Sequence, residues 1–107
     1  REGSLMIYYI DIDETICFYE GERDYPQAKP IKQNIEAINR LYNAGHTVVY
    51  WTARGTVTGI DWTELTHNQL DVWGAKYTDV KLGKPNYDLF ICDKAISSYM
   101  FFDKEEP

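Results

Sequence analysis

The chain has 107 residues, with 17 acidic against 11 basic side chains, a net charge of −6 and 44% hydrophobic residues. At roughly 100–150 residues per domain, this length allows one folded domain and excludes a second independent core. The acidic balance argues against broad binding to nucleic acid or to an anionic membrane, because both need clustered lysine and arginine. The longest apolar run, residues 5–10, is far below the roughly 20 residues that span a bilayer.

The start of the chain does not have the charged and then apolar order of a signal peptide, and Met6 directly precedes a strand-like run. We therefore interpret residues 1–5 as an addition that is not part of the natural protein, and we predict a single domain over 6–107. Cys17 and Cys92 lie in apolar surroundings without CxxC spacing, which predicts two small buried apolar residues rather than a disulfide framework or a zinc site. These features indicate a cytoplasmic protein.

The first half of the chain reads as strand, helix and strand. Residues 6–10 are a continuous apolar run, as in a buried strand of a parallel sheet. Residues 30–44 carry apolar side chains at helical spacing, and 47–51 are a second β-branched and aromatic run. Residues 16–29 leave room only for a helical turn and a hairpin flap.

The second half continues the alternation. The sequence predicts a helix over 62–73, a weak strand within 75–80, a clear strand over 89–92 and a short helix over 95–102. Strands that alternate with helices imply a mostly parallel sheet with helices on both faces. The fold class predicted is therefore three-layer α/β.

Polar side chains lie next to the predicted strands, at the edge where an open α/β sheet binds its ligand. They are Asp11 and Asp13 after the first strand, Thr52 after the second, Lys84 before the last and Asp93 at its end. Three carboxylates beside a lysine and a hydroxyl suit a hard cation such as Mg²⁺ together with an oxyanion. The pattern favours phosphoryl transfer.

Four segments resemble, in order, the motifs of the haloacid dehalogenase-like superfamily of phosphohydrolases. They are 11–15 (DIDET), 48–54 (VVYWTAR), 83–85 (GKP) and 89–93 (LFICD). Residues 51–55 (WTARG) and the stretch 83–95, from GKP to DKA, further resemble small members without a cap domain, which are associated with capsule or other polysaccharide pathways. The resemblance implies a minimal Rossmann-like core without a cap and a phosphomonoester hydrolase.

The resemblance also implies roles for the carboxylates. Asp11 would attack phosphorus and form an aspartyl-phosphate intermediate. Asp13 would protonate the leaving oxygen and then accept a proton from water, for which crowding with Asp11 and partial burial must raise its pKa. Mg²⁺, the implied cofactor, would be held by the Asp11 carboxylate, the Asp13 carbonyl and Asp93.

Other matched positions would bind the phosphate. Lys84 would neutralise the nucleophile and the phosphoryl oxygens, and the Thr52 hydroxyl would hydrogen-bond one of those oxygens. Ile12 and Ala53 complete the predicted phosphate-binding residues, and Thr15 would brace the first turn.

The stretch between Arg54 and Lys84 is too short for a cap domain, so the site should be open. An open site suits a bulky substrate, or a homo-oligomer in which a neighbouring subunit covers a small one. Candidate substrate contacts are Tyr19, Arg23 and Tyr25 of the flap, together with Arg54. Tyrosine and arginine residues in a flap more often pack the loop or face solvent than contact a substrate. For Arg54, a structural ion pair and a substrate contact are equally favoured.

One position departs from the family pattern. Many relatives have two adjacent acids in the fourth motif, whereas this chain has Cys92 followed by Asp93. The metal role therefore falls to Asp93, and weaker metal affinity is expected. Asp88 precedes the predicted strand and should lie at the opposite end of the sheet, which argues against its replacing the missing acid.

The leading hypothesis is a Mg²⁺-dependent phosphomonoester hydrolase that acts on a small sugar or polyol phosphate, with no membrane partner. A nucleotide or nucleic-acid end phosphatase is the second choice, which the acidic charge disfavours. A receiver-like phosphoacceptor uses similar residues, but its phosphorylated aspartate follows the third strand, whereas here Thr52 already follows the second. The remaining alternative is a non-catalytic domain that binds phosphate or a partner.

Overall fold

The computed structural model describes residues 4–105, and the side chains of residues 4–103. Residues 1–3, which belong to the predicted N-terminal addition, and residues 106–107 of the predicted domain lie outside the described residues. In the described range, none of the helices combines the length and apolar character needed to cross a membrane.

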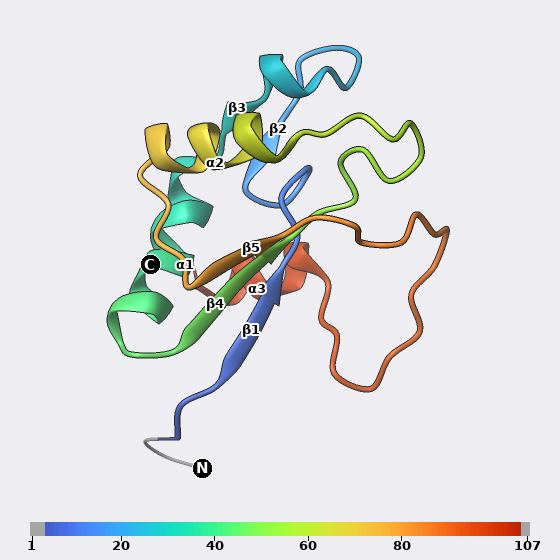
Figure 1. Cartoon of the computed structure of the whole chain (residues 1–107). Helices are drawn as coiled ribbons and strands as arrows, with labels where there is room; N and C mark the ends of the chain where they lie inside the picture. Colours follow the sequence, from blue (N-terminus) through green and yellow to red (C-terminus); the bar gives the residue numbers. More distant parts are fainter. Residues whose placement is uncertain (1–3, 106–107) are drawn as a thin grey trace.

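A parallel three-stranded sheet forms the centre of the fold (Figure 1). Its strands are β1 (Ile7–Ile10), β4 (Thr47–Trp51) and β5 (Asp79–Lys81), in the order β1-β4-β5. Helices connect these strands, because parallel neighbours need a long crossover. The predicted weak strand is realised as β5, later in the chain than expected, and Thr78 just before it already donates its N–H to the Val48 carbonyl at 2.8 Å.

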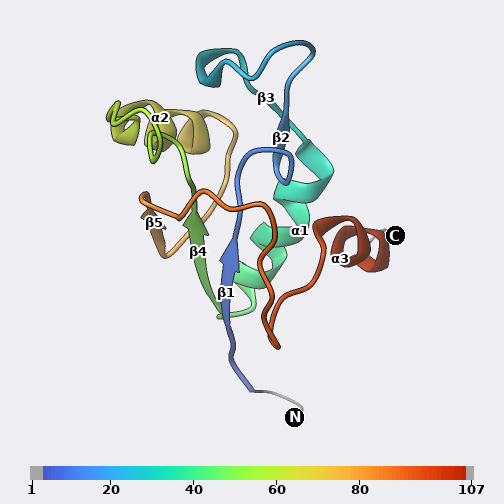
Figure 2. The ribbon, with the colours of Figure 1, turned by 90° about the vertical axis from the view of Figure 1, so that its right-hand side faces the viewer.

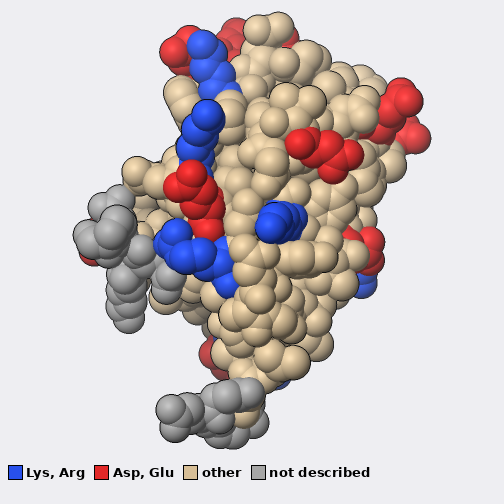
Figure 3. Space-filling view, turned by 90° about the vertical axis from the view of Figure 1, so that its left-hand side faces the viewer, with Lys and Arg blue, Asp and Glu red and all other residues tan. Residues whose placement is uncertain are grey.

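Three helices accompany the sheet. They are α1 (Lys32–Asn43), α2 (Thr63–Val72) and α3 (Ser98–Glu105). The first two lie within the helices that the sequence predicts, and α3 begins and ends a few residues later than expected. The outward side of α1 carries charges of both signs, at Lys32 and Glu36 for example, and Figure 3 shows basic and acidic side chains interleaved on this face of the molecule.

The core lies between the sheet and α1. Val48 and Tyr50 of β4 are fully buried and belong to one apolar cluster with Ile35 and Ile38 of α1. This cluster explains the spacing of the apolar residues in α1, since residues three apart share a helix face.

Among the residues that the structure describes, no helix covers the opposite face of β1. Ile7 is 70% exposed and Tyr9 is 52% exposed. Figure 1 places α1 and α2 on one side of the sheet and the chain between β5 and α3 on the other. The structure is therefore an α/β fold with a parallel sheet, as predicted, but over β1 the described chain does not form the expected third layer.

The predicted strand over 89–92 does not form. Leu89 is 76% exposed and Ile91 is 88% exposed, and the segment is a loop that stands in front of the sheet when its open face is viewed (Figure 2). A short apolar run becomes a strand only where a neighbouring strand pairs with it, and within residues 4–105 β1 pairs with β4 alone. Cys92 lies in this loop and is exposed, so the expectation that it is buried is wrong.

The predicted hairpin flap is present. It consists of β2 (Cys17–Phe18), β3 (Lys29–Pro30) and a 3₁₀ turn, η1 (Tyr25–Gln27), with β2 and β3 antiparallel. The flap rises above the carboxyl ends of the parallel strands (Figure 1). Together, the flap and the strand ends frame the site.

Candidate active site

A cleft of about 310 Å³ lies between the carboxyl ends of β1 and β4 and the flap. The predicted site residues that line it are Asp11, Asp13, Thr15, Arg23, Tyr25, Ala53, Arg54 and Lys84. The structure thus brings together residues from the first three matched motifs and from the flap. The position of the cleft agrees with the rule that open α/β sheets bind ligands beyond the carboxyl ends of their strands.

Asp11 and Lys84 form an ion pair in the cleft. The Lys84 Nζ atom lies 3.4 Å from Asp11 Oδ2, and Asp11 Oδ1 accepts a hydrogen bond from the Ile12 N–H at 2.9 Å. The side chain of Asp11 is 43% exposed, against 14% for that of Lys84. Asp11 therefore presents an accessible carboxyl group with a cation beside it.

The backbone of Lys84 is held on both sides. Its N–H donates to the Thr52 carbonyl at 3.1 Å, and its own carbonyl accepts a hydrogen bond from Thr56 Oγ1 at 2.7 Å. The ammonium group also lies over the rings of Trp51 and Tyr87, at 5.7 and 5.4 Å from their centroids. These contacts bring a loop lysine to the end of β4.

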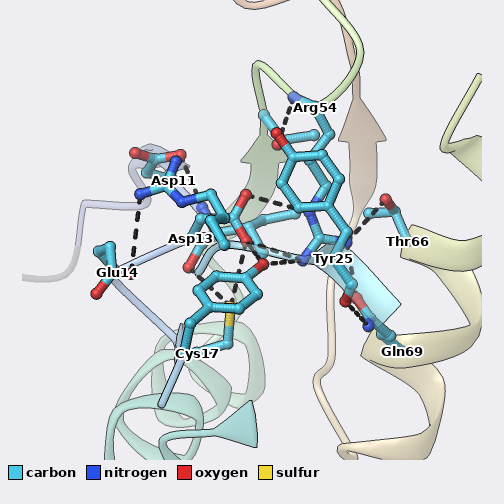
Figure 4. Close-up of polar contacts among 12 residues, drawn as sticks. Asp11, Asp13, Glu14, Cys17, Tyr25, Arg54, Thr66 and Gln69 are labelled. Atoms are coloured by element: carbon cyan, nitrogen blue, oxygen red, sulfur yellow. Dashed lines mark hydrogen bonds and ion pairs between the residues drawn. The ribbon is translucent and has the colours of Figure 1, made fainter. Parts of the chain in front are cut away.

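Asp13 is held in a buried ion pair with Arg54. Arg54 Nε donates to Asp13 Oδ2 at 3.1 Å and Nη2 donates to Oδ1 at 2.9 Å, so the pair is bidentate (Figure 4). Tyr19 Oη and Cys17 Sγ also donate to Oδ1. Both carboxylate oxygens of Asp13 are therefore engaged inside the protein.

This environment corrects the expectation for the pKa of Asp13. Burial raises that pKa, but the hydrogen bonds and the charge of Arg54 outweigh burial and hold it below its usual range. The neighbour that controls the ionisation is therefore Arg54 rather than Asp11, and Asp13 is ionised at neutral pH. Burial, aided by the charge of Asp13, raises the pKa of the Cys17 thiol to about 12, so this thiol stays protonated.

We expect the fold to lose stability in acid as Asp13 takes up a proton. Because its pKa is lower in the folded state, its contribution is present above the unfolded value of about 3.9 and is lost as the pH falls through the folded pKa. Urea unfolding from pH 7 to pH 3 measures this loss. Asp13→Asn should show a smaller fall in unfolding free energy over that range, and parallel falls in the two proteins would contradict the assignment.

Arg54 has an acceptor inside the protein for each of its five N–H groups. Besides the two bonds to Asp13, Nη1 donates to Thr66 Oγ1 at 3.1 Å and to Gln69 Oε1 at 2.7 Å, and Nη2 donates to Tyr19 Oη at 3.4 Å. A guanidinium carries five N–H donors, so none remains for a substrate phosphate. The geometry supports the structural ion pair and not the predicted substrate contact.

Thr52 lies beneath the cleft rather than in its wall. It is 1% exposed, and its Oγ1 accepts the Arg54 N–H at 3.1 Å. The bond that this hydroxyl accepts shapes the bend after β4, and the residue predicted to contact phosphate does not line the cleft. Ile12 is also fully buried, and its carbonyl accepts the Thr15 N–H, which closes the first turn.

The bend after β4 requires a glycine. Gly55 has φ +83°, and a Cβ there would lie 2.1 Å from the Ile60 carbonyl oxygen. Any side chain would displace this loop, which begins at Arg54.

Asp93 is not brought into the cleft. It lies in the exposed loop before α3, and its Oδ1 is 3.8 Å from Cys92 Sγ. Among the side chains that the structure describes, no three from His, Cys, Asp and Glu are grouped closely enough to hold a metal ion. Because Asp13 faces Arg54, Asp11 alone of the predicted carboxylates is open to the cleft. The two carboxylates predicted to hold Mg²⁺ are therefore not brought together in this arrangement, because Asp11 faces the cleft and Asp93 lies outside it.

Two of the three predicted flap residues reach the cleft. Arg23 lies 3.8 Å from Glu14 Oε2, with both side chains half exposed, which makes a weak ion pair. The Tyr25 ring covers the guanidinium of Arg54, with 4.8 Å between Cζ and the ring centroid. Tyr19 turns to Asp13 instead and does not line the cleft.

Sequence reasoning did not assign several lining residues. They are Glu14, Pro85, Asn86 and Tyr87. Glu14 has φ +62°, an uncommon conformation for a residue other than glycine. The available signal was that Glu14 and Pro85 belong to matched motifs and that Asn86 and Tyr87 directly follow one.

No protein-family model matches the chain, and no curated protein matches it by sequence. A crystal structure of a structural-genomics target from Vibrio cholerae is similar in fold, with a TM-score of 0.75 and 22% sequence identity. The match covers 96% of this chain and 100% of that chain. At this identity the likeness shows a shared α/β fold and says nothing about activity.

Proposed function

We propose that the protein is a phosphomonoester hydrolase of the haloacid dehalogenase-like type, with Asp11 as the nucleophile. The observation that carries the proposal is the exposed Asp11 carboxylate paired with Lys84 in a cleft at the strand ends. A carboxylate that approaches a phosphate dianion meets like-charge repulsion, and a cation at 3.4 Å offsets it.

The reaction divides into two displacements. A carboxylate oxygen of Asp11 forms a bond to phosphorus while the ester P–O bond breaks, and the leaving oxygen takes its proton from solvent because Asp13 is ionised. Water then attacks phosphorus and gives up a proton to solvent while the bond between phosphorus and the Asp11 oxygen breaks, which regenerates the Asp11 carboxylate and releases inorganic phosphate. Lys84 stabilises the phosphoryl oxygens in both steps.

The charges of the cleft favour a substrate with one phosphate and an uncharged body. Each acid has its own cation, in the pairs Lys84–Asp11, Arg54–Asp13 and Arg23–Glu14. No surplus cation is left among them for a second phosphate or a nucleic-acid backbone, which needs several. Tyr87 and Asn86 add a ring and an amide that suit a hydroxylated body. A small sugar or polyol phosphate is therefore the proposed substrate.

Phosphate release tests the proposal. The purified chain would be assayed with an aryl phosphate, sugar and polyol phosphates, nucleotides and end-phosphorylated oligonucleotides. The proposal expects turnover, with sugar or polyol phosphates preferred. Phosphate binding without turnover would instead favour the non-catalytic alternative, and stable phosphorylation by acetyl phosphate would favour the receiver-like one.

The requirement for Mg²⁺ is a separate prediction, because it comes from the family resemblance. We expect EDTA to stop hydrolysis and Mg²⁺ to restore it. Asp93→Asn should raise the Mg²⁺ concentration needed for the half-maximal rate. If that concentration does not change, Asp93 stays outside the site, as it does in this structure, and its assignment as a ligand is wrong.

A further inference from the structure

We propose that Gln69 is a positioning residue that fastens the flap to the Arg54–Asp13 pair. The inference rests on the proposed function, because it assigns the flap a role in holding substrate. Gln69 lies on α2 and is 9% exposed. Its two amide atoms have different partners, Arg54 and the flap residue Tyr25 (Figure 4).

The amide of Gln69 matches these partners in only one orientation. Its Oε1 accepts a hydrogen bond from Arg54 Nη1 at 2.7 Å, and its Nε2 donates to the Tyr25 carbonyl at 2.6 Å. A guanidinium can only donate and a carbonyl can only accept. The position therefore needs a side chain that accepts at one end and donates at the other, and glutamate lacks the donor.

The Tyr25 residue is attached at two points. Its carbonyl is bound by Gln69, and its ring covers the guanidinium of Arg54 and meets the Trp62 ring at 5.3 Å between centroids. Arg23 and Tyr25 are the flap residues that line the cleft. Gln69, which helps to orient Arg54 on Asp13, therefore also fixes the position of the flap over the cleft.

Thr66 provides a matched comparison. It lies on the same helix, is fully buried and accepts from the same Nη1 atom of Arg54 at 3.1 Å. Unlike Gln69, its side chain makes no hydrogen bond to the flap in the described structure. Thr66→Val and Gln69→Met thus each remove one acceptor from Arg54, and only Gln69→Met also releases the flap.

The experiment compares kinetics and backbone hydrogen exchange in wild type, Gln69→Met, Thr66→Val and the exposed neighbour variant Asn68→Ala. We expect KM for a phosphomonoester to rise about tenfold in Gln69→Met with kcat within about threefold, because a loosened flap loses contacts that bind substrate and transition state alike. Amides of residues 23–28 should exchange faster in Gln69→Met alone. Thr66→Val and Asn68→Ala should leave KM unchanged.

Equal KM and equal flap exchange in Gln69→Met and Thr66→Val would overturn the inference. If Gln69→Met does not fold, Gln69→Glu keeps the acceptor for Arg54 and is expected to show the same rise in KM. If the wild type hydrolyses no phosphomonoester, the proposed function fails, and exchange of residues 23–28 then decides the inference alone: faster exchange confined to Gln69 variants supports it, and unchanged exchange refutes it.

Discussion

Replacement of Asp11 by asparagine is expected to lower the rate of phosphomonoester hydrolysis at least about a thousandfold, since an amide oxygen cannot serve as the nucleophile. The variant should fold normally, because the Asp11 side chain is 43% exposed and lies outside the core. Initial rates with an aryl phosphate, together with circular dichroism to check the fold, measure both expectations.

Asp88→Asn is the matched control for the Asp11 variant. It removes one carboxylate from an exposed position outside the cleft, and we expect the rate to stay within about twofold of wild type, in line with the small effects of surface changes. A rate for Asp11→Asn close to that of Asp88→Asn would exclude Asp11 as the nucleophile.

Arg54→Leu should lower the free energy of unfolding by about 3–5 kcal/mol, the usual cost of removing one partner of a buried ion pair. The substitution leaves the ionised Asp13 at 8% exposure without its bidentate partner. It also removes the donors that Thr66 and Gln69 accept. Urea unfolding at neutral pH measures the loss.

Arg23→Leu provides the comparison for Arg54. Arg23 also pairs with an acid, but at 3.8 Å and with both side chains half exposed, so its loss should cost no more than about 1 kcal/mol. The double variant Asp13→Leu/Arg54→Leu should recover much of the stability, because it leaves no buried charge. If Arg54→Leu costs as little as Arg23→Leu, the Arg54–Asp13 pair does not hold the site together.

The parts of the fold that local pattern determines were predictable. The bounds of β4 were expected as they are found, and α1 lies within the predicted helix, because each buries one apolar face against the same core. The segment 89–92 has an equally apolar pattern, yet it forms no strand. Whether such a run becomes a strand depends on a pairing partner elsewhere in the chain, which its own residues do not specify.

The candidate site was likewise predictable from the sequence only in part. The position of Asp11 followed from the rule that ligands bind beyond the carboxyl ends of parallel strands, whereas the same rule placed Asp93 in a cleft that it does not reach. The pairing of Asp13 with Arg54 spans 41 residues and reverses the expected direction of the Asp13 pKa. The contribution of Gln69 was not foreseeable, because its helix shows no polar motif and its value comes only from two partners that the fold places on either side of it.

The central claim is that Asp11 becomes covalently phosphorylated, and trapping the phosphoenzyme tests it most directly. The protein would be mixed with a fast aryl phosphate, quenched in acid within milliseconds, digested and analysed by mass spectrometry. The account predicts one phosphoryl group on the peptide that contains Asp11, removed by hydroxylamine and absent from Asp11→Asn. A phosphoryl group on another residue, or turnover with no trapped phosphoenzyme on Asp11, would contradict it.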